Sequence, residues 1–232
     1  MLAAALIASR TDSKPVRWAP ELAPGTVEDA YRVQRDVLRA LDGERRPVAW
    51  KVSPPKPGAP PQASPVPLAG LHRSPAVLVP QGIVLGIECE VAFRLGRNGA
   101  VSEAFALIEL CTTRYADWSA ADALSRLADF QSHGAFVLGS GTPAWQRDYA
   151  GQRVELRIEG KVVKSTVGGH PTGDLEGMLA WAVDHCASRG WALEPGDIVT
   201  MGSWTGIAPL APGETATATF PGIGEARLTL GS

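Results

Sequence analysis

The sequence predicts an α+β fold. Two segments carry apolar residues at helical spacing, residues 26–41 near the start and 175–189 late in the chain. Between and after them run short segments in which apolar and polar residues alternate, as in β-strands. Strands dominate the second half without regular alternation with helices, which favours α+β over a doubly wound parallel sheet. No linker separates two units, so we expect a single domain over 1–232, with a helical N-terminal part (1–50) and a β-rich catalytic core (51–232).

Four segments predict helices. "MLAAALIASRTDSKPV" predicts an amphipathic first helix. Thr26 is a suitable N-cap for the second, with Glu28 and Asp29 in the first turn, where the helix dipole favours acids. "SAADALSRLADF" predicts a short third helix. In the fourth, one apolar stripe runs along residues 175–189 and Gly190 suits the position after the helix end. The stripe consists of Leu175, Met178, Leu179, Ala182, Val183 and Cys186.

Alternating or continuous apolar segments predict the strands. Residues 86–95, "GIECEVAFRL", alternate strictly and end at the turn signal "GRNG". "GAFVLGS" is typical of a buried strand, and "VELRIEGKVVKS" predicts a hairpin around Glu-Gly. "GDIVTMGS", "TATATF" and "EARLTL" predict short late strands. The prolines of residues 48–75 exclude a regular helix, so we expect a long loop there, a length often associated with function.

Composition limits the function. The net charge is −2 and the basic residues form no cluster, which argues against nucleic-acid binding. Cys89, Cys111 and Cys186 have no paired spacing, as expected for buried free thiols in a reducing compartment. The apolar start is too short to span a membrane and has no basic residues before it. We therefore expect a cytoplasmic protein with neither a nucleic-acid nor a membrane partner.

Three glutamates are candidate metal ligands. Glu88 and Glu90 point to the same face of a strand, where two carboxylates repel each other unless a positive charge lies between them. Hard oxygen ligands of this kind suit Mg²⁺ or Mn²⁺, but two are too few. Glu109 is a candidate third ligand, because it lies in the apolar run "ALIELC" and is costly to bury unpaired. The alternative is that all three acids face water.

Five segments occur in an order that resembles the 2-keto-4-pentenoate hydratase / 4-oxalocrotonate decarboxylase family, within the fumarylacetoacetate hydrolase superfamily. They are "IECEVAFRLGR", "ALIELCTTRYADW", "LADFQSHGAFVLGS", "GGHPTGDLEGMLAWAV" and "LEPGDIVTMGSWTGIAPLAPGETATATFPGIGEARLTL". The resemblance implies a mixed β-sandwich or roll with flanking helices. It also implies one divalent ion, Mg²⁺ or Mn²⁺, held by two glutamates of an E-x-E strand and a third before the T-R-x-x-D-W segment. These correspond to Glu88, Glu90 and Glu109.

The resemblance also indicates further site residues. Lys51 in "VAWKVS" takes the place of a catalytic acid/base lysine, and beside a dication its pKa would be lowered; the alternative is a surface lysine. Ser203 and Thr205 are candidates for binding a substrate carboxylate, and so is His170, for which a structural role at the helix entry is the alternative. His72 and His133 could act as bases, although loop or supporting roles suit them better. Arg114 could pair with Asp117 or Asp129.

The expected reaction is hydration of a small 2-hydroxy-2,4-dienoate, or its 2-oxo tautomer, to a 4-hydroxy-2-oxo acid in aromatic-compound catabolism. Decarboxylation of the 4-oxalocrotonate type and an inactive ligand-binding member of the superfamily are the alternatives. Three departures from the family bear on this choice: no room for a helix before Glu109, Leu68 in place of an acid, and Phe130 in place of an asparagine. The resemblance also implies a homo-oligomer.

Overall fold

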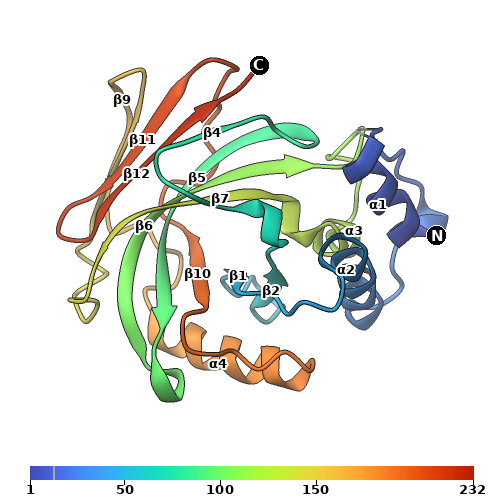
Figure 1. The fold of residues 1–232 in the computed structure, drawn as a ribbon, viewed down its shortest axis with the longest axis horizontal. Helices are drawn as coiled ribbons and strands as arrows, with labels where there is room; N and C mark the ends of the chain where they lie inside the picture. The colour runs from blue at the N-terminus through green and yellow to red at the C-terminus, as the bar shows by residue number, and fades with distance from the viewer. Residues whose placement is uncertain (13) are drawn as a thin grey trace.

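The computed structural model describes residues 1–12 and 14–232, which form two mixed β-sheets with helices on two sides (Figure 1). The helices are α1 (Leu2–Asp12), α2 (Val27–Asp42), α3 (Ala123–Ala128) and α4 (Leu175–Ser188). The strands are β1 (Ala49–Ser53), β2 (Gln62–Pro65), β3 (Leu71–Arg73), β4 (Ala76–Leu78), β5 (Ile83–Leu95), β6 (Val101–Thr113), β7 (His133–Thr142), β8 (Arg153–Ile158), β9 (Lys161–Val167), β10 (Ile198–Ser203), β11 (Thr215–Phe220) and β12 (Gly224–Leu230). The predicted α+β class is confirmed.

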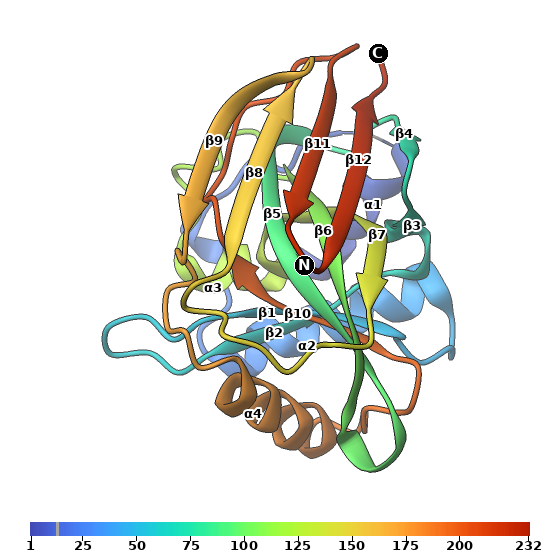
Figure 2. The same ribbon diagram turned by 90° about the vertical axis from the view of Figure 1, so that its left-hand side faces the viewer.

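The two sheets enclose the main core. The larger has the strand order β2-β1-β10-β5-β6-β7-β3, and the smaller has the order β4-β12-β11-β8-β9. Most neighbours are antiparallel, but β1 pairs with β10, β3 with β7 and β4 with β12 in parallel. Figure 2 shows the smaller sheet crossing in front of the long strands β5 and β6. Buried side chains of both sheets, such as Val91, Ile108, Ala218 and Leu228, share one apolar cluster.

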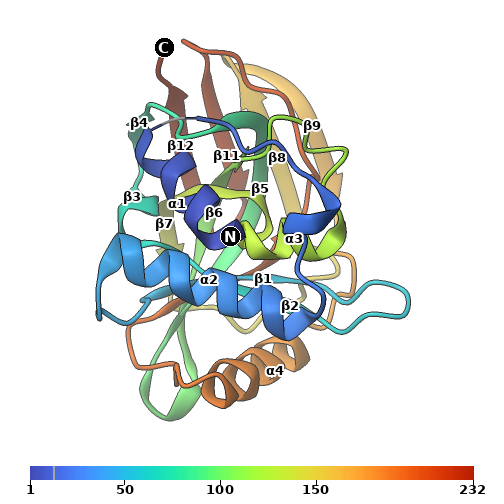
Figure 3. The same ribbon diagram turned by 90° about the vertical axis from the view of Figure 1, so that its right-hand side faces the viewer.

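The N-terminal helices form a second apolar cluster with α3 (Figure 3). Thr26 caps α2 as expected, and its hydroxyl accepts a hydrogen bond from the backbone N–H of Asp29 at 3.1 Å. One side of α1 is buried through Leu2 and Leu6, which confirms the predicted first helix. Among the described residues, no helix is long and apolar enough to cross a membrane.

Helix α4 packs its apolar stripe against the main core. Asp174 caps it by accepting from the N–H of Gly177 at 2.8 Å, and the predicted Gly190 follows the helix end with a φ of 81°. Five of the six predicted stripe residues are buried, and Val183 is partly exposed. The hairpin of β8 and β9 turns at Glu159 and Gly160 as predicted, both with positive φ.

The expected long loop over 48–75 is wrong in part. β1, β2 and β3 all lie inside it, and β1 and β2 form a hairpin at the edge of the larger sheet. Proline excludes helix but is compatible with an edge strand, where no ladder partner needs its missing N–H. Pro65 ends the edge strand β2 accordingly. The consequence for the site is that Lys51 lies on a strand, in register with Thr200 of β10.

Candidate metal centre and substrate pocket

The three glutamates lie on the two longest strands. Glu88 and Glu90 are on β5, and Glu109 is the direct register partner of Glu88 on β6. On the other side of β5, Ser203 of β10 pairs with Glu90. Glu90 is 1% exposed and Glu109 0% exposed, while Glu88 is partly exposed. The alternative of a solvated acidic face is therefore wrong for Glu90 and Glu109.

One cluster of possible ligand atoms differs from the predicted trio. Oxygens of Glu88 and Glu109 and the Sγ of Cys111 lie within 4.8 Å of one another, whereas Glu90 does not belong to this group. The Cys111 thiol contacts Oε2 of Glu88 at 3.6 Å. Burial, followed by the charge of Glu109, raises the pKa of Cys111 well above its usual value. The group therefore remains a thiol, a poor ligand for a hard cation.

Lys51 reaches the acids from β1. Its Nζ lies 2.9 Å from the Glu109 carboxylate and donates to the backbone oxygen of Gln131 at 3.1 Å. Burial is the largest single influence and lowers the pKa of Lys51, but the charges of Glu109, Cys111 and the other two glutamates together outweigh it, and the pKa is raised. The lowering of the Lys51 pKa is expected beside a bound dication and stays a prediction; without a metal ion the ammonium has its own carboxylate partner, Glu109.

Negative charge exceeds positive charge in this cluster. Burial raises the pKa of Glu90 well above its usual value, and the charges of Glu109 and Glu88 raise it further. The pKa of Glu88 is also raised, first by burial. For Glu109, burial is outweighed by Lys51 and His133, and the pKa is lowered. Lys51 thus compensates one carboxylate and leaves two others in mutual repulsion.

The donor set fits a hard divalent cation. Within the described part of the chain, the buried Oε2 of Glu90 accepts no hydrogen bond, and Oε2 of Glu109 is met by the ammonium of Lys51 at 2.9 Å. Carboxylate oxygens that are buried without a donor are costly unless a cation or water meets them. Oxygen ligands of this kind are those that Mg²⁺ and Mn²⁺ prefer.

A pocket of about 550 Å³ opens beside the acids. Its walls include Lys51, Glu88, Glu90 and Ser203. The Ser203 hydroxyl oxygen accepts from the N–H groups of Thr205 (3.2 Å) and Gly206 (2.9 Å), and its own proton is directed to Glu88, whose pKa this contact lowers. Thr205 also lines the pocket, but its hydroxyl donates to the Gly206 oxygen and accepts from the Cys89 N–H.

His170 supports this pocket from behind. Its Nε2 donates to the backbone oxygen of Met201 at 2.7 Å, and its Nδ1 accepts from the N–H of Gly173 at 3.3 Å. The ring packs against Trp204, 4.7 Å between centroids. Both nitrogens are therefore engaged, and the geometry matches the structural role at the helix entry. Direct contact of His170 and Thr205 with substrate stays a prediction.

Around Glu109, His133 has the supporting role that the sequence favoured, whereas sequence reasoning missed Gln131. His133 is fully buried, and its Nδ1 lies 2.9 Å from Oε1 of Glu109. Gln131 has left-handed backbone angles (φ 57°, ψ 40°), which turn its carbonyl to Lys51. The only signal for Gln131 in the sequence was its position just before a buried strand. His72 lines other cavities, not the pocket of the acids.

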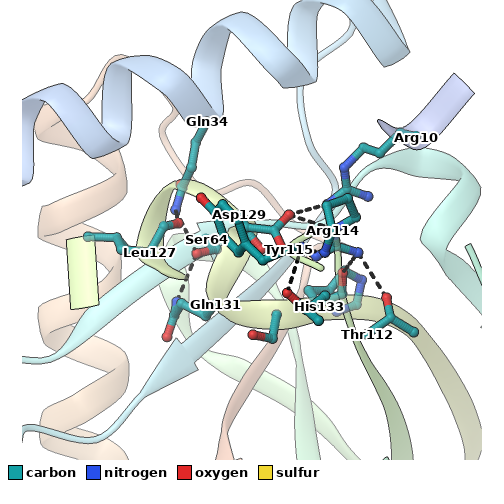
Figure 4. Close-up of polar contacts among 12 residues, drawn as sticks. Arg10, Gln34, Ser64, Thr112, Arg114, Tyr115, Leu127, Asp129, Gln131 and His133 are labelled. Carbon is teal, nitrogen blue, oxygen red and sulfur yellow. Dashed lines mark hydrogen bonds and ion pairs between the residues drawn. The ribbon is translucent and has the colours of Figure 1, made fainter. Parts of the chain in front are cut away.

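Arg114 is a scaffold residue, as one alternative proposed. Its Nε donates to Asp129 Oδ1 at 2.6 Å, and one terminal nitrogen donates to the His133 carbonyl at 3.0 Å (Figure 4). Asp117, the other candidate partner, instead accepts from Ser119. Arg114 therefore holds the segment from which His133 reaches Glu109.

The fold and this cluster define a class of protein that comparisons with known proteins identify. Residues 32–230 match the family model described as fumarylacetoacetate (FAA) hydrolase C-terminal. The chain therefore belongs to the fumarylacetoacetate hydrolase family, and the resemblance seen in the sequence is confirmed.

Solved structures show the same fold. The chain is similar to 4-oxalocrotonate decarboxylase from Pseudomonas putida G7, in complex with magnesium and adipate, at 22% identity and a TM-score of 0.82, over 99% of this chain and 95% of that one. A 2-hydroxyhepta-2,4-diene-1,7-dioate isomerase from Mycobacterium marinum matches at 17% identity and a TM-score of 0.57, over 79% of this chain and 73% of that one. No curated protein sequence matches.

Proposed function

We propose that the chain is a metal-dependent lyase acting on a small 2-oxo acid or its 2-hydroxydienoate tautomer. The observation that carries the proposal is the excess of buried carboxylate over ammonium where Glu88, Glu90 and Glu109 meet Lys51. A further cation would relieve this repulsion without protonating the acids, and the cluster borders a pocket large enough for a small acid.

Glu88, Glu90 and Glu109 would hold the Mg²⁺ or Mn²⁺. A divalent ion bound there supplies Lewis-acid stabilisation of negative charge that develops on the 2-oxo oxygen. The Ser203 hydroxyl turns from Glu88 to the substrate carboxylate and donates to it. Lys51, held by Glu109 and the Gln131 carbonyl, delivers a proton to the carbon skeleton. Thr205 and His170 keep the loop that carries Ser203 in place.

Decarboxylation of the 4-oxalocrotonate type is the reaction that the pocket supports best. Lys56 and Lys164 line the pocket in addition to Lys51, a charge pattern that suits a substrate with a second carboxylate. Loss of CO₂ leaves its electron pair in the conjugated 2-oxo acid, and a proton from Lys51 then quenches it. The structural similarity to a decarboxylase bound to a six-carbon diacid agrees with this choice.

Hydration of a dienoate is the second candidate. It uses the same acids and the same lysine, but the hydroxyl of water adds to C4 of the dienoate and a proton adds to C5, the carbon that carries the second carboxylate in the diacid. The partial exposure of Glu88 at the pocket favours it, because water reaches the acids there. An inactive ligand-binding protein is the third candidate, and an activity assay distinguishes the three.

The test is a spectrophotometric assay with 4-oxalocrotonate and with 2-hydroxy-2,4-pentadienoate, each with Mg²⁺, with Mn²⁺ and with EDTA. We expect turnover of the diacid that EDTA abolishes. Glu90→Gln should reduce kcat/KM by about 100-fold or more. Glu103→Gln, on the same strand as Glu109 but paired with Arg94 away from the pocket, is the matched control and should leave it unchanged. Metal-independent turnover, or no turnover of either acid, would refute the proposal.

A further inference from the structure

A second cavity, of about 440 Å³, lies between the N-terminal helices and the ends of the central strands. Leu110 and Thr112, the neighbours of Glu109 and Cys111 on β6, line it, together with Arg10 of α1. It shares no lining residue with the pocket of the acids. The proposed lyase activity gives this cavity no role.

Arg10 is a buried cation without a counterion of its own. Its side chain is 6% exposed, and its Nε has no hydrogen-bond partner in the described structure. Its guanidinium packs over the ring of Phe130, 4.9 Å from the centroid. The ion pair that it makes with Asp129 is long, at 3.5 Å.

Asp129 does not fully neutralise Arg10, because both of its carboxylate oxygens already accept hydrogen bonds from Arg114. Oδ1 of Asp129 accepts from Arg114 Nε at 2.6 Å, and Oδ2 accepts from the Arg114 backbone N–H at 3.0 Å (Figure 4). One carboxylate therefore stands against two guanidiniums. Burial and the charge of Arg114 lower the pKa of Arg10 to about 9, as expected for a cation that lacks an anion. An unpaired buried charge of this kind is costly until an anion joins it.

The other walls determine the rest of the ligand. Val77 and Val79 line the cavity and are 74% and 71% exposed, which leaves an apolar rim open to solvent. Leu41 and Leu78 extend this apolar surface. Asp42, the acid of the cavity wall, has Oδ2 turned to the backbone N–H of Leu68 at 2.9 Å. One guanidinium fork beside apolar walls suits a carboxylate with an aliphatic tail better than a phosphate, which needs more donors.

We propose that this cavity binds a small aliphatic monocarboxylate, whose carboxylate pairs with Arg10 and whose tail packs on Leu78 and Val79. The ligand would give Arg10 its missing anion and cover the apolar rim. Asp129 links Arg10 to Arg114, which holds the His133 carbonyl. A chain of contacts through Asp129, Arg114 and His133 therefore connects the new site to Glu109, although the two sites share no lining residue.

The test is isothermal titration of the full chain with 4-methylpentanoate in EDTA, which removes any binding through a metal ion in the other pocket. We expect saturable binding, and binding about tenfold weaker or absent for the neutral isostere 4-methylpentanamide. Arg10→Gln should cause the same loss. Arg32→Gln is the matched control, since its side chain is 68% exposed and pairs only with Asp29 among the described residues.

A second variant makes the test independent of the folding of Arg10→Gln. Ala69 is exposed at the cavity wall, so Ala69→Trp should block the cavity while Arg10 itself is retained, and it should also abolish binding. Equal affinity for acid and amide, or unchanged binding in Ala69→Trp, would overturn the proposal. Binding that requires Mg²⁺ and survives Arg10→Gln would place the carboxylate in the pocket of the acids and would overturn it as well.

Discussion

Glu88 on β5 lies directly opposite Glu109 on β6, and the ammonium of Lys51 contacts only the second of these two carboxylates. Like charges in direct cross-strand register destabilise a sheet. Here the repulsion is built into the two longest strands, next to Glu90 at the next position on the same face. A cation bound between these carboxylates would therefore relieve their repulsion.

The repulsion predicts opposite effects of one substitution with and without metal. Glu88→Gln should stabilise the metal-free protein by about 1 kcal/mol, because it removes one of the repelling charges. It should also reduce the stabilisation that Mn²⁺ adds. Thermal unfolding in EDTA and in Mn²⁺ measures both. The matched control is Glu103→Gln. It breaks the ion pair with Arg94 and should therefore not stabilise the metal-free protein. A Glu88→Gln protein that still gains full stability from Mn²⁺ would contradict the metal assignment.

Replacing Lys51 should change metal binding and catalysis in opposite directions. Lys51→Met removes the ammonium that competes for Glu109, so Mn²⁺ should bind more tightly, by about tenfold. The same change removes the proton donor and should lower kcat by about 100-fold or more. Calorimetric titration with Mn²⁺ and the lyase assay measure the two effects. Weaker Mn²⁺ binding would show that Lys51 organises the acids instead of competing for them.

The buried pair of Arg114 and Asp129 should be important for stability. Both side chains are 1% exposed, so Asp129→Asn leaves two guanidiniums without a carboxylate and should cost about 3–5 kcal/mol of unfolding free energy. Urea unfolding measures the loss. Glu103→Gln breaks an ion pair whose side chains are 30% and 33% exposed, and it should cost less than about 1 kcal/mol. Similar losses of unfolding free energy in Asp129→Asn and Glu103→Gln would contradict this prediction.

His185 predicts a dependence of stability on pH. Its ring stacks on Trp181 at 4.4 Å, and burial, aided by the charge of Arg189, lowers its pKa to about 4. The unfolded chain takes up this proton near pH 6.5 and the folded chain only near pH 4. Stability is therefore fully present above pH 6.5 and is lost as the pH falls from 6.5 to 4.

The loss from His185 should amount to about 1–2 kcal/mol, because the ring keeps some contact with water. His185→Gln should remove this part of the pH dependence, which urea unfolding at pH 4.5 and pH 7.5 measures. His170 and His133 also have lowered pKa values, so a smaller slope should persist in the variant. A slope identical to that of the unchanged protein would contradict the assignment.

The sequence alone determined the elements and the chemistry of the candidate site. Local rules act within one segment: the spacing of apolar residues predicted α2, α4 and β5, and the Thr26 cap marked where α2 begins. The same alternation placed Glu88 and Glu90 on one face. Glu88, Glu90 and Glu109 stood out as charges in apolar runs, whereas Lys51 and Ser203 were candidates through the family resemblance.

The tertiary structure decided which charges meet. β1 and β2 lie inside a proline-rich segment that local rules describe as loop, because β1, the strand with which β2 pairs, is itself held in the sheet by β10 from far along the chain. The raised pKa of Lys51 depends on Glu109, 58 positions away, and His133 and Cys111 joined the acids only through the register of β5, β6 and β7. Arg10 likewise lacks a full counterion because α1 places it beside Asp129, whose carboxylate already accepts a hydrogen bond from Arg114. Pairings of this kind depend on distances between distant segments, which no local pattern encodes.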